Sequence, residues 1–283
     1  MSEPSSTIES RDQSLLRNGE LSIRKVLRRS AALVGRNIGA ILLAMIGPVT
    51  IVTLVWELFP TSGGPDNLSV ALRGLVAFFA WVLLWVGFAS VLHARFLDRR
   101  HSPPVWRALI WSRTQLEFLF GIFRVTLVLI LVGVVAGIPI ALAGAIATWL
   151  GILAELVGLL VVSYVWARLA MVFPSASVGK PLAIKDSWSL TSSAVWRVAF
   201  LLGLLYIASR ILVPLALSLP LLADVPPATD WLVRAVSAAL MFGGAAVVAA
   251  ILSATYQALV ETRPPDVRDT YIPQDGTHLA DAF

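Results

Sequence analysis

Two ionisable residues, Glu155 and Arg210, interrupt long apolar stretches of the chain and are the first candidates for chemistry. If these stretches cross a membrane, a rise of about 1.5 Å per residue places Arg210 about 18 Å from the cytoplasmic end of its helix. The same rise places Glu155 about 10 Å from the outer end of its own helix. Measured from opposite sides of a hydrocarbon core about 30 Å thick, the two depths nearly match. We therefore expect an intramembrane charged pair. It either lines a substrate or ion path or only neutralises two buried charges, and the lack of a further acid or histidine for a relay favours the second role.

Four cations, Arg168, Lys180, Lys185 and Arg197, bracket a polar segment of the sequence. Basic side chains at an anionic membrane surface contribute on the order of 1 kcal/mol each. Four of them beside one segment suit the binding of phospholipid headgroups. The alternative, which the sequence favours, is the ordinary anchoring of a membrane protein by basic residues on its cytoplasmic side.

Other residue types give little support for chemistry. The chain has no cysteine, which excludes disulfides, thiolate nucleophiles and cysteine-based metal sites. His93 and His101 flank Asp98, but this spacing matches no zinc pattern and nearby arginines repel a cation. The sequence contains no Gly-x-Ser-x-Gly elbow and no glycine loop that would cradle a phosphate. We expect no metal, no cofactor, no catalytic activity and no nucleic-acid partner.

The composition indicates which elements must position these residues. Of the 283 residues, 58% are hydrophobic and 14% are charged, and the mean hydropathy is +0.82. Soluble domains are nearer half apolar and a quarter charged. A chain this apolar cannot bury its hydrophobic side chains in one core, so a bilayer must solvate them. The ten tryptophans agree, since indole rings favour the headgroup region.

Hydropathy predicts six membrane spans within a single membrane domain over residues 21–260. The spans lie at about 38–59, 68–92, 125–146, 149–168, 198–222 and 231–259. No cleavable signal precedes them, so the first span is expected to act as the insertion signal. Polar residues 1–20 and 261–283 are expected to be disordered tails. Glu57 and Arg73 are placed to pair beside the first outer loop, and close helix contacts or kinks are expected at Gly133, Gly137, Gly144 and Gly151.

The basic residues orient these spans. Seven lie at or before Arg36, five lie between Arg95 and Arg113, and further groups lie at 168–197 and 263–268. The connections near 60–67, 147–150 and 223–230 have no lysine or arginine. Loops rich in lysine and arginine face the cytoplasm. Each group of basic residues must therefore be separated from the next by an even number of membrane crossings. We expect six crossings with both termini cytoplasmic.

A pattern of elements occurs three times along the chain, at a spacing of roughly 80 residues. Each unit is an amphipathic cytoplasmic helix followed by a two-span hairpin, and the units begin near Leu21, Pro103 and Pro181. Pro181 suits the first position of a helix, where its missing N–H costs nothing. The expected apolar faces are Ile23, Val26, Leu27, Ser30 and Val34; Val105, Leu109, Ser112 and Leu116; and Ile184, Trp188, Thr191 and Val195.

The third unit carries a family resemblance. Its sequence YVWARLAMVFPSASVGKPLAIKDSWSLTSSAVWRV resembles the signature of a membrane-domain family, found in some bacterial glycerophosphodiester phosphodiesterases and in stand-alone integral membrane proteins. The matching residues are Tyr164, Arg168, Leu169, Pro174, Ser187, Trp188, Leu190, Thr191, Trp196 and Arg197. The resemblance extends over most of the chain up to about Leu259 and is most specific at residues 164–197.

The resemblance implies a six-helix bundle in the bacterial inner membrane. In fused members a soluble catalytic barrel follows the membrane domain, whereas here only a short tail follows the sixth span. No phosphodiesterase chemistry is therefore carried over. We expect a non-catalytic membrane protein that contacts lipids or partner proteins through its cytoplasmic helices. The alternative is a transporter or lipid translocator with a polar site around Glu155 and Arg210, and an intramembrane enzyme ranks last.

Overall fold

The computed structural model describes residues 21–58, 67–97, 104–205 and 230–263, and all statements below concern these ranges. Within them the chain is helical and contains no strand, which confirms the all-α prediction. Five helices are long and apolar enough to cross a membrane, or six if one bent pair of helices counts as a single span. The predicted span at 198–222 lies mostly outside the described residues, so the count of six and the threefold repeat stay predictions.

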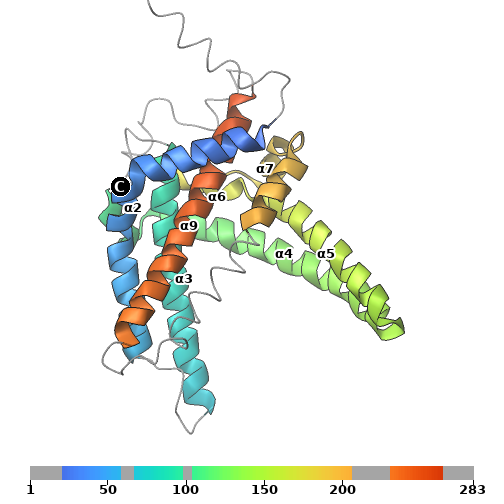
Figure 1. The fold of residues 1–283 in the computed structure, drawn as a ribbon, viewed down its shortest axis with the longest axis horizontal. Helices are drawn as coiled ribbons and strands as arrows, with labels where there is room; N and C mark the ends of the chain where they lie inside the picture. The colour runs from blue at the N-terminus through green and yellow to red at the C-terminus, as the bar shows by residue number, and fades with distance from the viewer. Residues whose placement is uncertain (1–20, 59–66, 98–103, 206–229, 264–283) are drawn as a thin grey trace, which may run out of the picture.

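Three long helices form the body of the molecule: α2 (Ile23–Leu58), α3 (Asn67–Leu97) and α9 (Asp230–Glu261). The first and last of these, α2 and α9, pack side by side, and α3 contacts both (Figure 1). Large apolar side chains that are fully buried fill the space between them. Phe88 of α3 meets Phe242 of α9 edge to face, with ring centroids 5.2 Å apart, a favoured geometry for aromatic pairs.

The basic segment and the first span form one continuous helix, α2, and not two elements. Its N-terminal part runs across the body and the rest turns to run along it (Figure 1). Val26, Ser30 and Leu33 are buried, while Arg24 and Arg28 are exposed. The predicted amphipathic segment is therefore not a separate helix, and Val26 and Ser30 of its predicted apolar face are buried against protein.

The predicted helix over 105–116 is instead a short 3-10 helix, η2 (Val105–Leu109), followed by the start of α4 (Arg113–Ile146). Ser112 caps α4, and its backbone N–H donates to Gln115 Oε1 at 2.7 Å. The Gln115 side chain also donates to the Arg107 carbonyl oxygen at 2.9 Å. Reciprocal capping satisfies donors that a helix N-terminus leaves free, so this sequence stops and restarts the helix.

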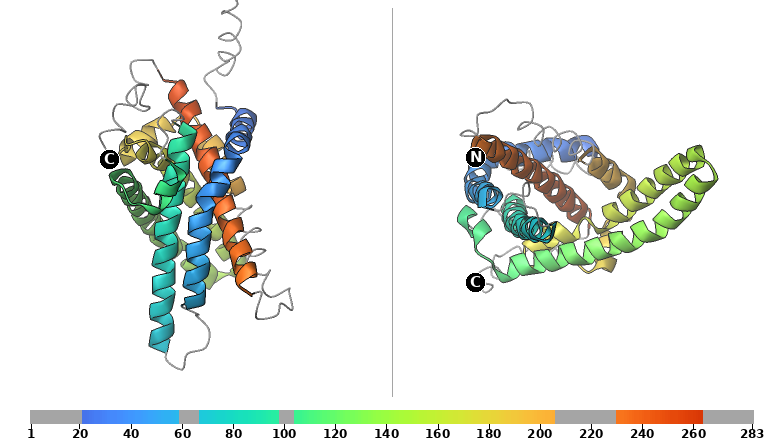
Figure 2. Two further views of the ribbon diagram at one scale, coloured as in Figure 1. Left: turned by 90° about the vertical axis from the view of Figure 1, so that its left-hand side faces the viewer. Right: turned by 90° about the horizontal axis from the view of Figure 1, so that it is seen from below.

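Helices α4 and α5 (Thr148–Leu169) form a long hairpin, here called the arm. The chain reverses at Ala147, within the expected turn region. A Cβ on Gly151 would lie 2.9 Å from the Gly144 Cα, so the two glycines let the helices meet closely near the tip. Gly133 and Gly137, in contrast, have nothing within 4 Å of an added Cβ. The arm extends away from the body (Figure 2).

After the arm the chain enters the protein interior through α6 (Val172–Ser177), all of whose residues are buried. This short helix packs against α3, α4 and α9. No element was predicted for these residues, so this buried helix is an addition to the predicted fold. Ser175 and Ser177 donate to the Val172 and Pro174 carbonyl oxygens at 2.8 and 2.7 Å, so their hydroxyls are satisfied without water.

The third amphipathic element is α7 (Ile184–Leu190), with Ala183 as its N-cap. Pro181 precedes the helix and is not its first residue, which corrects the expected start. The buried residues are Ser187, Leu190 and Thr191, whereas Ile184 and Trp188 are exposed. A further helix follows from Val195 to Leu205, bent by 103° from α7.

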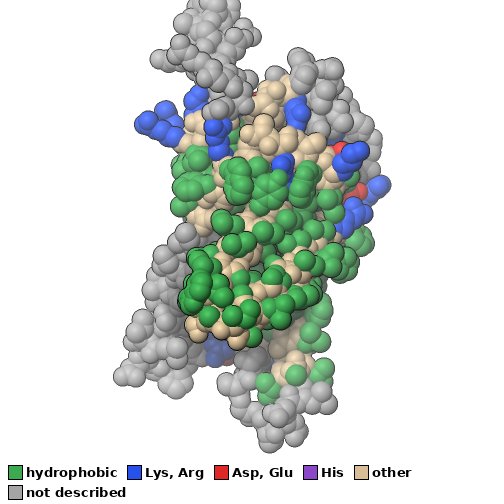
Figure 3. Space-filling view, turned by 90° about the vertical axis from the view of Figure 1, so that its right-hand side faces the viewer, with side chains coloured by type: hydrophobic (Ala, Val, Ile, Leu, Met, Phe, Trp, Pro, Cys, Tyr) green, Lys and Arg blue, Asp and Glu red, His purple; other side chains and the backbone are tan. Residues whose placement is uncertain are grey.

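Lysine and arginine side chains gather at one end of the molecule, above a largely hydrophobic surface (Figure 3). This end contains the start of α2, α7 and the end of α9 (Figure 1). We call it the basic end.

Candidate functional site

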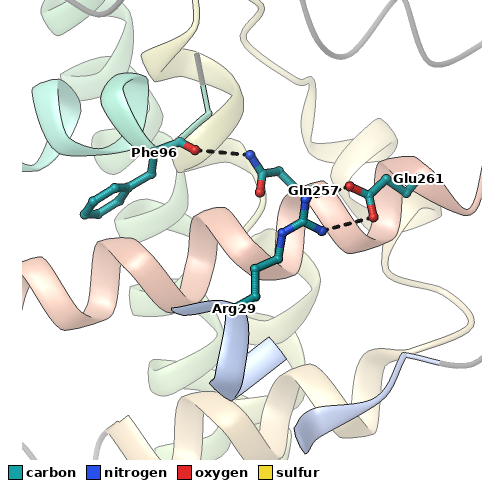
Figure 4. A network of polar contacts seen from close by, with 4 residues as sticks. All are labelled: Arg29, Phe96, Gln257 and Glu261. Carbon is teal, nitrogen blue, oxygen red and sulfur yellow. Dashed lines mark hydrogen bonds and ion pairs between the residues drawn. The ribbon is translucent and has the colours of Figure 1, made fainter. Parts of the chain in front are cut away.

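The basic end holds the first and last helices together through an ion pair. Arg29 Nη1 and Nη2 donate to the two carboxylate oxygens of Glu261 at 3.0 and 2.8 Å (Figure 4). One turn earlier on α9, Gln257 donates to the Phe96 carbonyl oxygen at 3.1 Å. The three body helices therefore meet at this end, where α2 starts and where α3 and α9 finish.

A second ion pair lies at the opposite end of α2 and α9. Arg234 Nη1 donates to the Trp56 carbonyl oxygen at 3.1 Å, and Arg234 Nε lies 3.7 Å from Glu57 Oε1. The prediction that Glu57 pairs with Arg73 was wrong, because the cation beside Glu57 comes from α9. The two ion pairs join α2 to α9 at both ends.

Between these ends, buried polar contacts connect the body helices. His93 Nδ1 of α3 lies 2.8 Å from Ser253 Oγ of α9, and both side chains are buried. Ser30 Oγ of α2 lies 3.5 Å from the Ala250 carbonyl oxygen and donates more closely to Val26 within its own helix, at 2.8 Å. His93 thus has a structural partner inside the helix body.

Arg168 lies near the end of α5 and is 8% exposed. Its Nε and Nη2 donate to the Tyr164 hydroxyl at 3.2 and 2.7 Å, and its Nη1 donates to the Trp188 carbonyl oxygen at 2.9 Å. The guanidinium carbon lies 5.1 Å from the Tyr164 ring centroid and 5.2 Å from that of Trp188. Aromatic faces attract a desolvated cation by up to about 2 kcal/mol. We call these three residues the aromatic clamp.

The aromatic clamp fastens α7 to the end of α5. Ser187 Oγ donates to the Arg168 carbonyl oxygen at 2.7 Å, so the two segments exchange hydrogen bonds in both directions. Tyr164 also packs against Trp196, with ring centroids 5.4 Å apart. Thr191 is buried and donates to the Ser187 carbonyl oxygen at 3.0 Å. Pro174, the remaining motif residue, is buried in α6.

The four predicted lipid-binding cations have different environments. Arg168 is buried in the aromatic clamp and faces no open surface. Lys185 is exposed on α7, and Lys180 and Arg197 are half-buried on either side of it in the sequence. Trp188 and Trp196 are 39% and 64% exposed, respectively. Basic and tryptophan side chains that are exposed or half-buried therefore lie on one structural unit, which we call the α7 surface: Lys180, Lys185, Trp188, Trp196 and Arg197.

Other contacts of this region were not predictable from the sequence. Arg263, just beyond α9, donates to the Ser189 carbonyl oxygen at 2.9 Å, which ties α7 to the basic end. The partners of Arg29 and Arg234 are more than 170 positions away. The spacing of residues within one helix does not predict contacts between residues so far apart in the sequence.

The predicted pair of Glu155 and Arg210 remains a prediction. Glu155 is exposed on α5, while Arg210 lies outside the described residues, as do His101 and Asp98. Within the described ranges, no group of three or more His, Asp or Glu side chains is placed to hold a metal ion. The chain matches no protein-family model, and no curated protein or solved structure matches it.

Proposed function

We propose that this chain is a non-catalytic integral protein of the bacterial inner membrane, with six crossings and both termini cytoplasmic, whose α7 surface binds anionic phospholipid headgroups. Membership of the phosphodiesterase membrane-domain family is part of this proposal. Its support is that five motif residues, Tyr164, Arg168, Ser187, Trp188 and Trp196, are joined by direct contacts. A motif whose members meet in space is better explained by a shared structure than by chance similarity.

The positions of the chain's contacts support six crossings. Ser189 meets Arg263 at the basic end, and Arg234 meets Glu57 at the opposite end. Arg234 and Arg263 are separated by about 43 Å along α9, at a rise of about 1.5 Å per residue. The chain must cover that length between Ser189 and Arg234, and it exceeds a hydrocarbon core of about 30 Å. Such a return would be the fifth crossing, in addition to α2, α3, the arm and α9.

The α7 surface carries the lipid part of the proposal. Trp188 and Trp196 are exposed beside Lys185 and Arg197, while the buried Arg168 donates to the Trp188 carbonyl oxygen. Indole rings favour the headgroup region, and basic residues beside them attract anionic headgroups. The observation that carries the proposal is this exposure of aromatic and basic side chains on a segment that a buried arginine holds in place.

Native mass spectrometry in mild detergent tests this function. We expect the wild-type protein to retain phosphatidylglycerol or cardiolipin, and the triple variant Lys180→Gln, Lys185→Gln and Arg197→Gln to retain several-fold less. The matched control removes three exposed cations from α2 at the same end, through Arg24→Gln, Lys25→Gln and Arg28→Gln. Equal loss in both variants, or loss in neither, would contradict a specific site at the α7 surface.

A further inference from the structure

Among the described residues, Glu155 and Arg73 are two of the ionisable side chains that have no partner and lie on exposed apolar helix segments. Glu155 is exposed on α5 between the exposed Leu153 and Leu156. Arg73 is half-exposed on the first part of α3, beside the exposed Leu72. Within the described residues neither side chain makes an ion pair or a hydrogen bond. A charge that faces hydrocarbon is costly, and such residues characteristically pair with one another.

The two charges are opposite in sign and lie at similar distances from the starts of their helices. Arg73 lies six residues after the start of α3 at Asn67, and Glu155 lies seven residues after the start of α5 at Thr148. At about 1.5 Å per residue, the side chains lie about 9 and about 10 Å along their helices. Both helices start at the outer membrane surface in the proposed topology. Opposite charges at similar distances from the outer ends of their helices favour pairing between the two side chains.

The two residues do not meet within one molecule. The arm that carries Glu155 extends away from the body that contains α3 (Figure 2). Glu57, the acid closest to Arg73 in the expected layout, is already paired with Arg234. The arm itself is apolar on its outer faces, with Ile152 and Leu159 at least half exposed. Both charges therefore lack a partner among the described residues.

We propose that a second copy of this chain covers the arm, and that Glu155 of one copy forms an ion pair with the partner's Arg73. This inference rests on the proposed topology, because it takes the two depths from a common membrane surface. A twofold axis along the membrane normal keeps both copies in one orientation and forms the contact twice. The exposed leucines beside each charge then pack in the same interface.

Cross-linking in native membranes tests the contact directly, because the chain has no cysteine. We expect co-expressed Glu155→Cys and Arg73→Cys chains to form a dimer with a short bis-maleimide. The control pairs Arg73→Cys with Leu127→Cys, an exposed site on α4 about 28 Å from the tip of the arm. It should not cross-link. No dimer from the first pair, or equal yields from both pairs, would overturn the proposal.

Charge exchange provides a second test that does not depend on cysteine chemistry. Glu155→Arg and Arg73→Glu should each reduce the dimer seen by native mass spectrometry at least tenfold, and the double exchange should restore it. Failure of the double exchange to restore the dimer would overturn the proposal. Restoration of Glu155→Arg by Arg210→Glu would also overturn it, in favour of a pair within one chain.

The same preparations separate failure of this inference from failure of the proposed topology. Each variant is washed with alkali, and retention in the membrane fraction shows that the chain is integrated. If the wild-type protein is monomeric but stays in the membrane fraction after the wash, the dimer proposal is overturned and the proposed topology is not. Release of the wild-type protein by the wash overturns both.

Discussion

Arg168 shows how a cation can be buried in this protein without a carboxylate. Among the described residues it has hydrogen bonds to a hydroxyl and a carbonyl oxygen, and two aromatic faces lie beside it. The planar guanidinium suits this arrangement because it can stack on rings and donate in its own plane at once. A lysine ammonium has no such plane.

Replacement of Arg168 therefore tests the aromatic clamp. We expect Arg168→Lys to destabilise the folded protein by about 2 kcal/mol or more, since the Trp188 carbonyl oxygen loses its charged donor in a buried setting. Thermal unfolding in detergent, followed by tryptophan fluorescence, measures the change. The exposed Lys185→Gln should stay within about 0.5 kcal/mol of the wild type. Equal effects of the two substitutions would contradict a structural role for Arg168.

The ion pair of Arg29 and Glu261 should contribute much less. Both side chains are 38% exposed, and exposed ion pairs typically contribute about 1 kcal/mol or less. We expect Glu261→Gln to lower the unfolding free energy by less than about 1 kcal/mol, and a rise in salt to shrink that difference. A loss larger than that of Arg168→Lys would show that water is excluded from this pair.

At the scale of elements, the contact between α3 and η2 depends on a single glycine. A Cβ at Gly87 would lie 2.0 Å from the Ala108 carbonyl oxygen, which is far inside van der Waals contact. Ala108 belongs to η2, whose backbone lies directly on α3. Helix η2, which connects α3 to the arm, can therefore lie this close to α3 only because Gly87 has no side chain.

Gly87→Ala should displace η2 and lower the apparent unfolding temperature by several degrees, the size expected for overpacking of about 1–3 kcal/mol. Gly39→Ala in α2 is the matched control, because an added Cβ there meets nothing within 4 Å. Alanine favours a helix over glycine by about 1 kcal/mol, so the control should be neutral or stabilising. The same scan in detergent measures both, and a neutral Gly87→Ala would contradict the close approach.

The elements that the sequence predicts well are those with a strong local signal. The arm's turn at Ala147 follows from the length of the apolar stretch, since one crossing cannot hold it. Helix α6 could not be predicted this way. Ser175 and Ser177 indicate a polar surface, yet both hydroxyls bond to carbonyl oxygens nearby and the segment is buried. Hydropathy does not distinguish a polar group in water from one that is satisfied locally.

The candidate site was predictable in its composition but not in its arrangement. The motif residues Tyr164, Arg168 and Trp188 are in contact, which the motif itself does not state. It could not indicate that Arg168 is buried while Lys185 is exposed. That division follows from how α7 packs on the end of α5, which is a tertiary property.

At the scale of the whole molecule, the first and last long helices are neighbours, joined near both ends by Arg29 with Glu261 and by Glu57 with Arg234. In an arrangement closed in this way, α2 finishes and α9 starts at the end opposite the basic end, so the chain between them must return to that opposite end. This arrangement also brings both ends of the described chain to the basic end, where the basic residues gather (Figure 3). The charge distribution and the helix contacts thus support one orientation in the membrane.

Labelling of single cysteines in spheroplasts with a membrane-impermeant maleimide tests that orientation most directly. The account predicts that Trp149→Cys at the tip of the arm is labelled from outside, as are Pro65→Cys and Pro227→Cys. It also predicts that Lys25→Cys and Ser192→Cys react only after the membrane is permeabilised. Labelling of Ser192→Cys in intact spheroplasts, with Trp149→Cys protected, would contradict the six-crossing account.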